Sequence, residues 1–523
     1  MTRGQRIGMA FGVVAAVLVL AGVAGLVAYD HRAVLYDAWL RWRVEPAFVQ
    51  RPCWFAMPAP REAVCGHLYV YENRETKRKL VRLPVIRFQA TGVRPTDPVL
   101  FIQGGPGSPA TTGDDAGRYW ASVIEGMEWL GNRDLIVFDQ RGVGEARPAL
   151  TCPELAETRD DPLNTDHYLR ATAACYARLK RQGHDLDAYS TIATAEDIEE
   201  LRKRLGIEKW NLWGASYGSR VALLLMERYP QGLRSVLIES VLPRDAFEEE
   251  DGGLNLGAAL EKIFAACKAD AACNAAFPHL RERFAEILQR LKLEPVDVFL
   301  PARDDLPEQR VKLDALLFLN AIHSELYNFV GVEEFPRLIE QVWRRDYDAL
   351  HPALDMLDDM MFGPAADGMM YSVLCAESGL PSRALVERVG RRYPYLRDYA
   401  ENAVAGDPCL VWKMPQRIDR RPVASEVPTL LLAGHFDHVT PPEWAERAAR
   451  TLRNGHVFVI PLAAHDASDS RCGTALATRF LLDPSRKPLD DCTMMRAIDF
   501  RIETKPPAPA SGATRKDATK PKQ

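Results

Sequence analysis

The sequence lacks an excess of charge of either sign, and it lacks internal repeats. Its 523 residues include 66 lysines and arginines against 71 aspartates and glutamates, which leaves a net charge of −5. Proteins that bind nucleic acid present a basic surface, so this balance gives no support for nucleic acid as a partner. The absence of a repeat gives no support for a solenoid. Hydrophobic residues make up 47% of the chain, enough for a large core in two folding units or in one domain with an insertion.

The ten cysteines include no C-x-x-C pair, so a zinc ribbon or a thioredoxin-type motif has no support. An even number of cysteines in an exported chain favours disulfides, whereas a cytosolic chain would keep them as buried thiols. Short loops close most easily, which favours pairing between neighbours in the sequence. The expected disulfides are Cys53–Cys65, Cys152–Cys175, Cys267–Cys273, Cys375–Cys409 and Cys472–Cys492.

The N-terminus carries an uncharged run of 23 residues, 7–29, preceded by Arg3 and Arg6. This run is long enough to cross a bilayer as a helix, and the basic residues before it favour a cytoplasmic N-terminus. The rest of the chain would then lie on the periplasmic or extracellular side. The alternative is a cleaved signal peptide, with the small residues of 21–25 as the cleavage region and a secreted product.

Short apolar runs alternate with helical stretches after a tether that is expected to end near residue 50. Two early runs, 66–73 and 84–92, are consistent with a hairpin. Continuous apolar strands separated by helices indicate a parallel sheet that is covered on both faces. The further expected strands are 97–105, 133–142, 210–216, 234–243, 428–437 and 456–465.

Two helices flank the strand at 210–216. Residues 194–206 form an amphipathic pattern that ends at Gly206, and residues 216–230 form a second helix that ends at Pro230. Between about 245 and 420 the pattern is mostly helical, which predicts a cap inserted between the sixth and seventh core strands. The expected division is an anchor or signal peptide (1–30), a first core part (50–245), a cap (246–420), a second core part (421–502) and a disordered tail (503–523).

The pattern G-x-S-x-G occurs at 214–218, with Ser216 at its centre. Small residues on both sides permit a sharp turn, and the expected strand before and helix after Ser216 provide the context of a nucleophile elbow. A serine hydroxyl needs a base to remove its proton and a third group to orient that base. The five-residue pattern alone is also compatible with an ordinary loop serine, so its partners decide the interpretation.

Asp437 and His465 follow the last two expected strands. The order Ser216, Asp437, His465 is that of an α/β-hydrolase triad, and all three residues lie at carboxyl ends of strands. Taken singly, Asp437 could be a turn residue and His465 a surface residue. The stretch GHFDH (434–438) resembles a metal cluster, but three such close neighbours rarely converge on one ion, so no metal or other cofactor is expected.

The loop FIQGGPGSP (101–109) supplies glycines directly after a strand. Missing Cβ atoms allow its backbone to approach a substrate, as an oxyanion hole requires. A phosphate-binding loop is the alternative, but the Lys-Ser/Thr ending of that motif is absent. The expected oxyanion donors are the backbone N–H groups of Tyr217 and Gly105, with Gly104 as a further candidate.

Four motifs, QGGPG (103–107), DQRGVG (139–144), GASYG (214–218) and GHFDHVTP (434–441), together resemble the proline iminopeptidase and tripeptidyl aminopeptidase-like group of α/β-hydrolases. The resemblance covers about 60–245 and 420–500, and Cys492 fits the C-terminal region of the secreted members. It implies an α/β-hydrolase fold with a helical cap, and cleavage of N-terminal residues from peptides through an acyl-enzyme. The chain departs from the family at Gln103 (usually His), at Ala146 (often Ser) and at Ala464-His465-Asp466 (usually Gly-His-Gly).

An aminopeptidase must also bind the free ammonium group of its peptide substrate, which a carboxylate can do. By resemblance, Glu239 after the nucleophile helix and Glu377 in the cap are the candidates, while the acidic run 248–251 is expected to be a solvated linker. The alternatives are a structural hydrogen bond for Glu239 and a solvated cap residue for Glu377. A carboxylic-ester hydrolase with the same triad, or a non-catalytic binding module on this scaffold, remain as alternative functions. The oligomeric state stays open.

Overall fold

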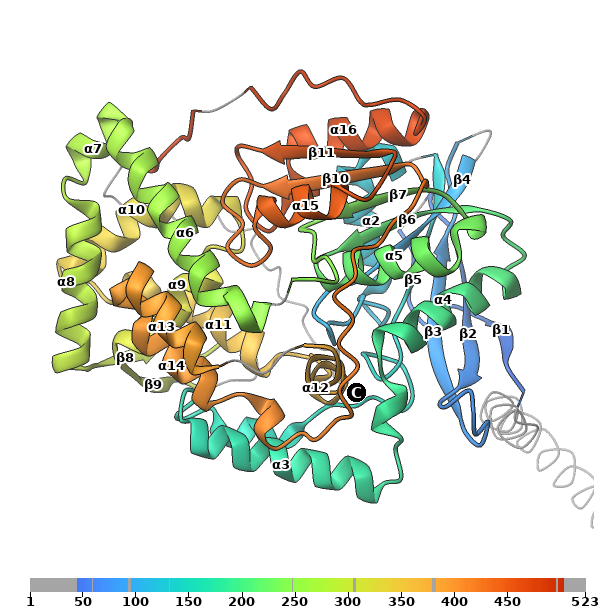
Figure 1. Ribbon diagram of the computed structural model, residues 1–523, viewed down its shortest axis with the longest axis horizontal. Coiled ribbons are helices and arrows are strands. Elements are labelled where there is room, and N and C mark those ends of the chain that lie inside the picture. Colours follow the sequence, from blue (N-terminus) through green and yellow to red (C-terminus); the bar gives the residue numbers. More distant parts are fainter. Residues whose placement is uncertain are drawn as a thin grey trace, which may run out of the picture.

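The computed structural model describes residues 45–502, except 59, 93–95, 131, 247, 304–306, 379–381 and 495–496. A twisted nine-stranded sheet with flanking helices forms one part, and a group of helices packs against one end of it (Figure 1). The expected anchor (7–29) and the expected tail (503–523) lie outside the described residues. Among the described residues, no helix is long and apolar enough to cross a membrane.

The strand order in the sheet is β1-β2-β3-β5-β4-β6-β7-β10-β11. The strands β4, β5, β6, β7, β10 and β11 run parallel, whereas β1, β2 and β3 form an antiparallel edge that joins the sheet at β5. Each expected strand is present, and the early pair is the predicted hairpin. The strands are β1 (Ala47–Arg51), β2 (Ala63–Tyr71), β3 (Leu80–Phe88), β4 (Thr96–Ile102), β5 (Arg133–Phe138), β6 (Trp210–Ala215), β7 (Leu233–Glu239), β10 (Thr429–Gly434) and β11 (Gly455–Ile460).

Helices cover both faces of the sheet, which explains why its central strands are apolar along their whole length. On one face α4 (Thr191–Arg204), α5 (Tyr217–Arg228) and α15 (Pro442–Ala449) pack against the strands, with side chains such as Ile198 and Val221 in the core. On the other face α2 (Ala116–Gly126) and α16 (Arg471–Leu482) cover a second core. The predicted helices 194–206 and 216–230 correspond to α4 and α5.

The prediction of a tether up to residue 50 is wrong at its end, because residues 47–51 form the edge strand β1. This strand is short and carries few fully buried side chains, so its sequence gives a weak signal. Tertiary contacts hold it: the Cys53–Cys65 disulfide closes directly after it, and the Phe48 ring lies so close to Gly66 that a side chain there would not fit.

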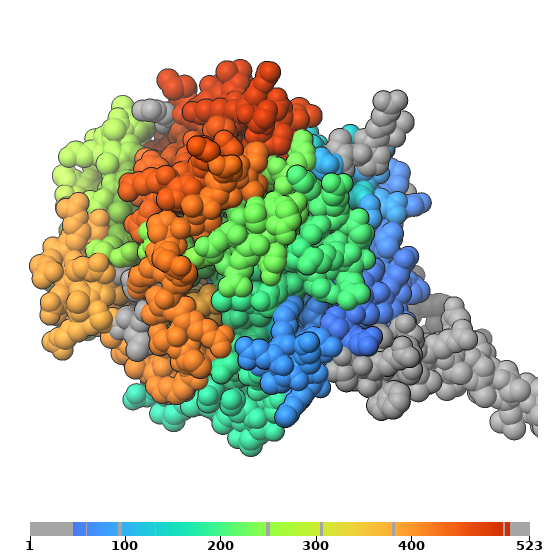
Figure 2. All heavy atoms as spheres, turned by 45° about the vertical axis from the view of Figure 1, so that its right-hand side comes forward, coloured from blue at the N-terminus to red at the C-terminus, as the bar shows by residue number. Residues whose placement is uncertain are grey.

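A separate helical group, residues 248–405, lies between β7 and β10 and is called the cap segment below. It has its own core, which contains Phe264, Phe284, Phe318 and Phe335. The orange band in Figure 2 shows how the chain then returns over the surface towards β10. The cap segment contains α6 (Glu248–Ala269), α7 (Ala271–Ala276), α8 (Leu280–Leu293), β8 (Val296–Leu300), β9 (Gln309–Leu313), α9 (Ala315–Glu325), α10 (Phe329–Trp343), α11 (His351–Phe362), α12 (Asp367–Glu377), α13 (Arg383–Arg392) and α14 (Arg397–Ala405).

All ten cysteines form disulfides, and the five predicted pairs are confirmed. The bridges close short sequence separations of 6 to 34 residues. Disulfides of this density are typical of proteins that fold in an oxidising compartment.

Candidate active site

Ser216 occupies a sharp turn between β6 and α5. Its backbone has φ 54° and ψ −123°, a conformation that costs on the order of 1–3 kcal/mol for a residue with a side chain. The turn is this tight because a Cβ on Gly218 would lie 2.0 Å from the Ile102 carbonyl oxygen, and one on Gly214 would lie 2.6 Å from the Gly218 carbonyl oxygen. The strand–turn–helix context predicted for Ser216 is therefore present.

Asp437 and His465 are brought together by the loops after β10 and β11. The His465 Nδ1 atom lies 2.9 Å from Oδ2 and 3.1 Å from Oδ1 of Asp437. The Thr440 hydroxyl and the Val439 and Thr440 backbone N–H groups also donate to this carboxylate. Burial alone would raise the pKa of Asp437, but the adjacent His465 and the hydrogen bonds outweigh it and lower that pKa. The carboxylate thus stays ionised beside the imidazole.

The glycine loop after β4 lies directly on the serine. A Cβ on Gly104 would be 2.9 Å from the Cβ of Ser216, and Gly105 adopts φ 105°. The Gly104 N–H donates to the Gln103 Oε1 atom (2.8 Å). The Gly105 N–H, in contrast, has no hydrogen-bond acceptor among the described residues. The Ala366 N–H, at the start of α12, donates to the Gly107 carbonyl and fixes the far side of the loop.

The loop after β5 forms hydrogen bonds with the neighbouring glycine loop and the residues directly after it through Asp139 and Gln140, while Arg141 lies next to them. Asp139 accepts hydrogen bonds from the Ala110 N–H and the Thr112 hydroxyl, and the Gln140 side chain donates to the Gln103 carbonyl (2.7 Å). The DQRGVG motif is therefore a support for the glycine loop, a role that the sequence analysis did not identify.

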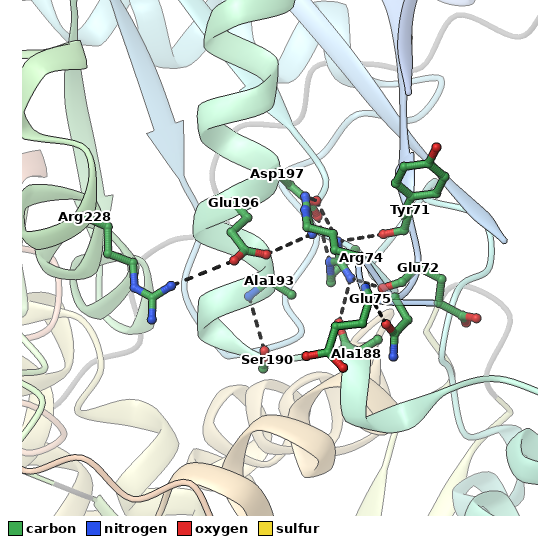
Figure 3. A network of polar contacts seen from close by, with 12 residues as sticks. Tyr71, Glu72, Arg74, Glu75, Ala188, Ser190, Ala193, Glu196, Asp197 and Arg228 are labelled. Atoms are coloured by element: carbon green, nitrogen blue, oxygen red, sulfur yellow. Dashed lines mark hydrogen bonds and ion pairs between the residues drawn. The ribbon is translucent and has the colours of Figure 1, made fainter. Parts of the chain in front are cut away.

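Arg141 is fully buried and ties this loop to α4. It donates to both oxygens of Asp197 (2.6 and 2.7 Å) and to the Glu72 and Ala188 carbonyl oxygens. Figure 3 shows the surrounding network, in which Asp197 and Glu196 of α4 face Arg74 near the end of the β2 strand.

Glu239, at the end of β7, is buried close to His465. Its carboxylate accepts hydrogen bonds from the Trp213 Nε1–H, the Ser468 N–H and the Ser468 hydroxyl, at 2.6–2.8 Å. Burial raises the pKa of Glu239 in spite of these donors. These contacts agree best with the predicted alternative, in which Glu239 forms structural hydrogen bonds.

A cavity of about 450 Å³ adjoins His465, Ala215 and Gln103. Three carboxyl groups border it: those of Glu239, Asp466 and Asp469. Aromatic rings form much of its remaining wall: Phe101, Tyr119, Trp120 and Trp213. Partial burial raises the pKa of Asp469 to about 7, and repulsion by Glu239 and Asp466 adds to the rise. Asp469 was not among the residues predicted from the sequence, because its only signal there is its position four residues after His465.

Glu377 lies elsewhere, at the end of α12. Its carboxylate accepts hydrogen bonds from the N–H (2.8 Å) and the hydroxyl (2.5 Å) of Thr191, and the Thr191 hydroxyl lies 2.9 Å from the hydroxyl of Tyr217. It borders a second, smaller cavity together with Arg220 and Arg417. The structure therefore does not bring Glu239 and Glu377 to one cavity.

These features agree with what comparison with known proteins shows. Residues 97–471, more than two thirds of the chain, match the family described as the alpha/beta hydrolase fold. The chain belongs to the α/β-hydrolase family. This match confirms the predicted α/β-hydrolase fold class and the family resemblance that the motifs of the hydrolase indicated.

Curated relatives of the hydrolase are distant. A serine protease of Mycobacterium tuberculosis is 28% identical over 247 residues, which is 43% of this chain and 45% of the relative. The hydrolase thus spans less than half of the length of that relative. The tripeptidyl aminopeptidase of Streptomyces lividans is 24% identical over 428 residues (76% of this chain and 77% of the relative). A probable proline iminopeptidase of Streptomyces coelicolor is 30% identical over 145 residues (28% and 32%).

Replacing Gly104 by alanine tests how closely the glycine loop must approach Ser216. The added methyl group would meet the Ser216 Cβ and the Ala215 carbonyl oxygen (3.0 Å), so the loop or the serine must move. We expect kcat of Gly104→Ala to fall about 100-fold, since a shift of about 1 Å at a reacting centre has an effect of this size. Steady-state kinetics checks this, with Gly390→Ala in α13 as the matched control because the nearest atoms to a Cβ at Gly390 are side-chain atoms of Arg397, at 3.5 Å or more. Equal kcat values for the two variants would contradict it.

Proposed function

We propose that the protein is an exported serine aminopeptidase that removes proline or short peptides from the N-termini of peptides. In this proposal Ser216 attacks the scissile carbonyl while His465 accepts its proton, and Asp437 holds the Nδ1–H side of His465. The backbone N–H groups of Tyr217 and Gly105 stabilise the oxyanion. His465 then protonates the leaving amine, and a water molecule hydrolyses the acyl-enzyme by the same route.

The observation that carries the peptide specificity is the acidic and aromatic cavity beside His465. A free N-terminus is a cation, and both carboxylates and aromatic faces bind cations. Glu239 and Asp466 already accept hydrogen bonds from the protein, whereas none of the described residues donates one to the Asp469 carboxylate. We therefore assign the ammonium contact chiefly to Asp469, with Glu239 adding negative charge behind it. Glu377 stays a second candidate, through the cap.

Replacing Asp469 by asparagine tests this assignment. For aminoacyl and tripeptidyl amides with a free N-terminus, we expect KM of Asp469→Asn to rise about tenfold with little change in kcat, because a charged hydrogen bond to the substrate is lost. N-acetylated copies and simple esters of the same acyl groups should show no change. In the wild type, KM for the free amines should also rise as the pH falls below about 7, where Asp469 takes up a proton and loses its charge.

The exposed Asp348 of the cap segment does not border the cavity, so Asp348→Asn provides a matched control that makes the same chemical change elsewhere. The Glu377→Gln variant tests the second candidate with the same substrates. If both Asp469→Asn and Glu377→Gln have wild-type KM and kcat for free amines and for esters, the enzyme is not an aminopeptidase of this kind. A wild type that cleaves esters and acetylated substrates as readily as free amines would indicate the carboxylic-ester hydrolase.

Export is supported by the five disulfides and by the apolar run at 7–29. We infer that this run anchors the enzyme in the membrane, or is removed as a signal peptide, with the catalytic part on the outer side. Cell fractionation of the full chain tests this proposal, and a product confined to the cytosol would contradict it.

A further inference from the structure

The turn between α9 and α10, residues 326–329 of the cap segment, contacts the loop that carries His465. The His465 backbone N–H donates a hydrogen bond to the Tyr327 carbonyl oxygen (3.0 Å). In the opposite direction, the Phe329 N–H donates to Oδ2 of Asp466 (3.1 Å). The cap turn and the His465 loop are thus joined by two hydrogen bonds, which run from the adjacent residues His465 and Asp466 to Tyr327 and Phe329.

Asp466 is the residue that makes this connection. Its second oxygen, Oδ1, accepts a hydrogen bond from the Ala464 N–H (2.9 Å), so one carboxylate binds the residue before His465 and the cap turn at the same time. In the family pattern that the motifs resemble, glycine stands at this position, and glycine has no side chain that could form such a bridge. Asp466 therefore gives a physical reason for a departure from the family pattern that the triad alone does not explain.

Ring contacts reinforce the same connection. The Tyr327 ring meets the His465 ring edge-on, with centroids 5.3 Å apart and planes at 78°, and it meets the His438 ring at 5.2 Å. The Phe329 ring packs on Phe436, which precedes Asp437. Phe436 and Ala464 belong to the same buried cluster as the cap core, so the packing continues across the boundary.

We propose that the α9–α10 turn is a positioning element for the catalytic base, and that Asp466 is the positioning residue through which it acts. This inference rests on the proposed triad. A general base is effective only when its ring is held at hydrogen-bond reach of the nucleophile, and small displacements have large effects. Because the cap segment fixes the loop that carries His465, the cap has a role in turnover as well as in substrate choice.

The first experiment removes the Phe329 N–H without removing the carboxylate. Phe329 is the first residue of α10, where proline is well tolerated, and the preceding Asn328 has the extended conformation (φ −105°, ψ 149°) that a following proline requires. The Phe329→Pro variant therefore deletes the donor to Asp466, and Phe329→Ala is the matched control that loses the same ring but keeps the N–H. We expect Phe329→Pro to have a kcat about tenfold below that of Phe329→Ala, with KM within about twofold.

The second experiment repeats both substitutions in the presence of Asp466→Ala. If the hydrogen bond carries the effect, the difference between Phe329→Pro and Phe329→Ala should then disappear. The proposal is overturned if Phe329→Pro and Phe329→Ala have equal kcat values when Asp466 is present. It is also overturned if their kcat values still differ in the Asp466→Ala background. Asp466→Asn is an independent variant of nearly unchanged size, which keeps only one acceptor oxygen for two N–H donors. With ester substrates, which carry no ammonium group, it should lower kcat about tenfold at constant KM, and wild-type kinetics for this variant also overturn the proposal.

The rate of phosphonylation of Ser216 by a fluorophosphonate should follow the same pattern as kcat. This reaction needs the nucleophile and its base but no peptide specificity. A wild type that reacts while cleaving no free-amine substrate would disprove the aminopeptidase, and the same variants with esters would then test the positioning role of the α9–α10 turn. A folded wild type that does not react at all would disprove the triad, and the positioning role of the α9–α10 turn with it.

Discussion

Replacement of Ser216 by alanine is expected to lower kcat by about 10⁴–10⁶-fold and to abolish labelling by a fluorophosphonate probe. Triad enzymes that lose their nucleophile keep only the rate contributed by substrate binding and the oxyanion hole, which gives a loss of this size. The measurement is kcat on the best substrate together with gel detection of the labelled chain. Thermal unfolding should be little affected, because alanine keeps the Cβ in the strained turn and removes only the hydroxyl.

Ser240 provides a stringent control for this experiment. It follows the neighbouring strand β7, it is buried, and it also has a positive φ of 47°. No described residue forms a hydrogen bond with its hydroxyl. Ser240→Ala should therefore keep kcat within about twofold and keep labelling. Retained labelling in Ser216→Ala would show that the nucleophile is another residue and would remove the basis of the proposed mechanism.

Replacement of Arg141 by methionine is expected to lower the free energy of unfolding by about 3–5 kcal/mol. Arg141 is fully buried, and its removal leaves the Asp197 carboxylate buried with one partner fewer and leaves two carbonyl oxygens without their donor. Arg74 still reaches Asp197, as Figure 3 shows, but it lies on the more exposed side of the network. Urea unfolding with the disulfides intact, followed by tryptophan fluorescence, measures the change.

Arg204→Met is the matched control for this prediction. Arg204 forms an exposed pair with Glu200 one helical turn away on the same helix as Asp197, and such pairs contribute less than about 1 kcal/mol. The double variant Arg141→Met with Asp197→Leu should regain part of the loss, because no buried charge is left unpaired. If Arg141→Met and Arg204→Met destabilise the protein equally, the buried network contributes no more than a surface pair.

The parts of the site that could be predicted from sequence are those that local patterns determine. Gly214, Ser216 and Gly218 lie between a continuous apolar strand and an amphipathic helix, so the elbow was visible before the structure. Asp437 and His465 could be predicted as partners because both follow strands whose ends meet at one edge of a parallel sheet. The five disulfides join sequence neighbours, so the entropy of loop closure was sufficient to pair them.

Contacts between distant segments could not be predicted in this way. Glu239 and Glu377 have similar sequence signals, yet Glu239 contacts Ser468 near His465, whereas Glu377 contacts Thr191 on α4. Only the folded chain determines which donors a buried carboxylate meets. Asp466 differs from these two glutamates, because the sequence already identified it as a departure from the family pattern. Its hydrogen bonds with two backbone N–H groups explain this departure.

The cap segment contacts three of the four loops that bear proposed catalytic groups, and the turn at Ser216 is the fourth. Ala366 holds the glycine loop at Gly107, and Tyr327 holds the loop of His465. The third loop is held from α6, where the Lys262 ammonium donates to the His435 carbonyl (3.0 Å) and Asn255 donates to the Val439 carbonyl. Exchange of this cap for that of another hydrolase would therefore remove all three supports together. Engineering a new specificity by cap grafting would need these contacts in the graft.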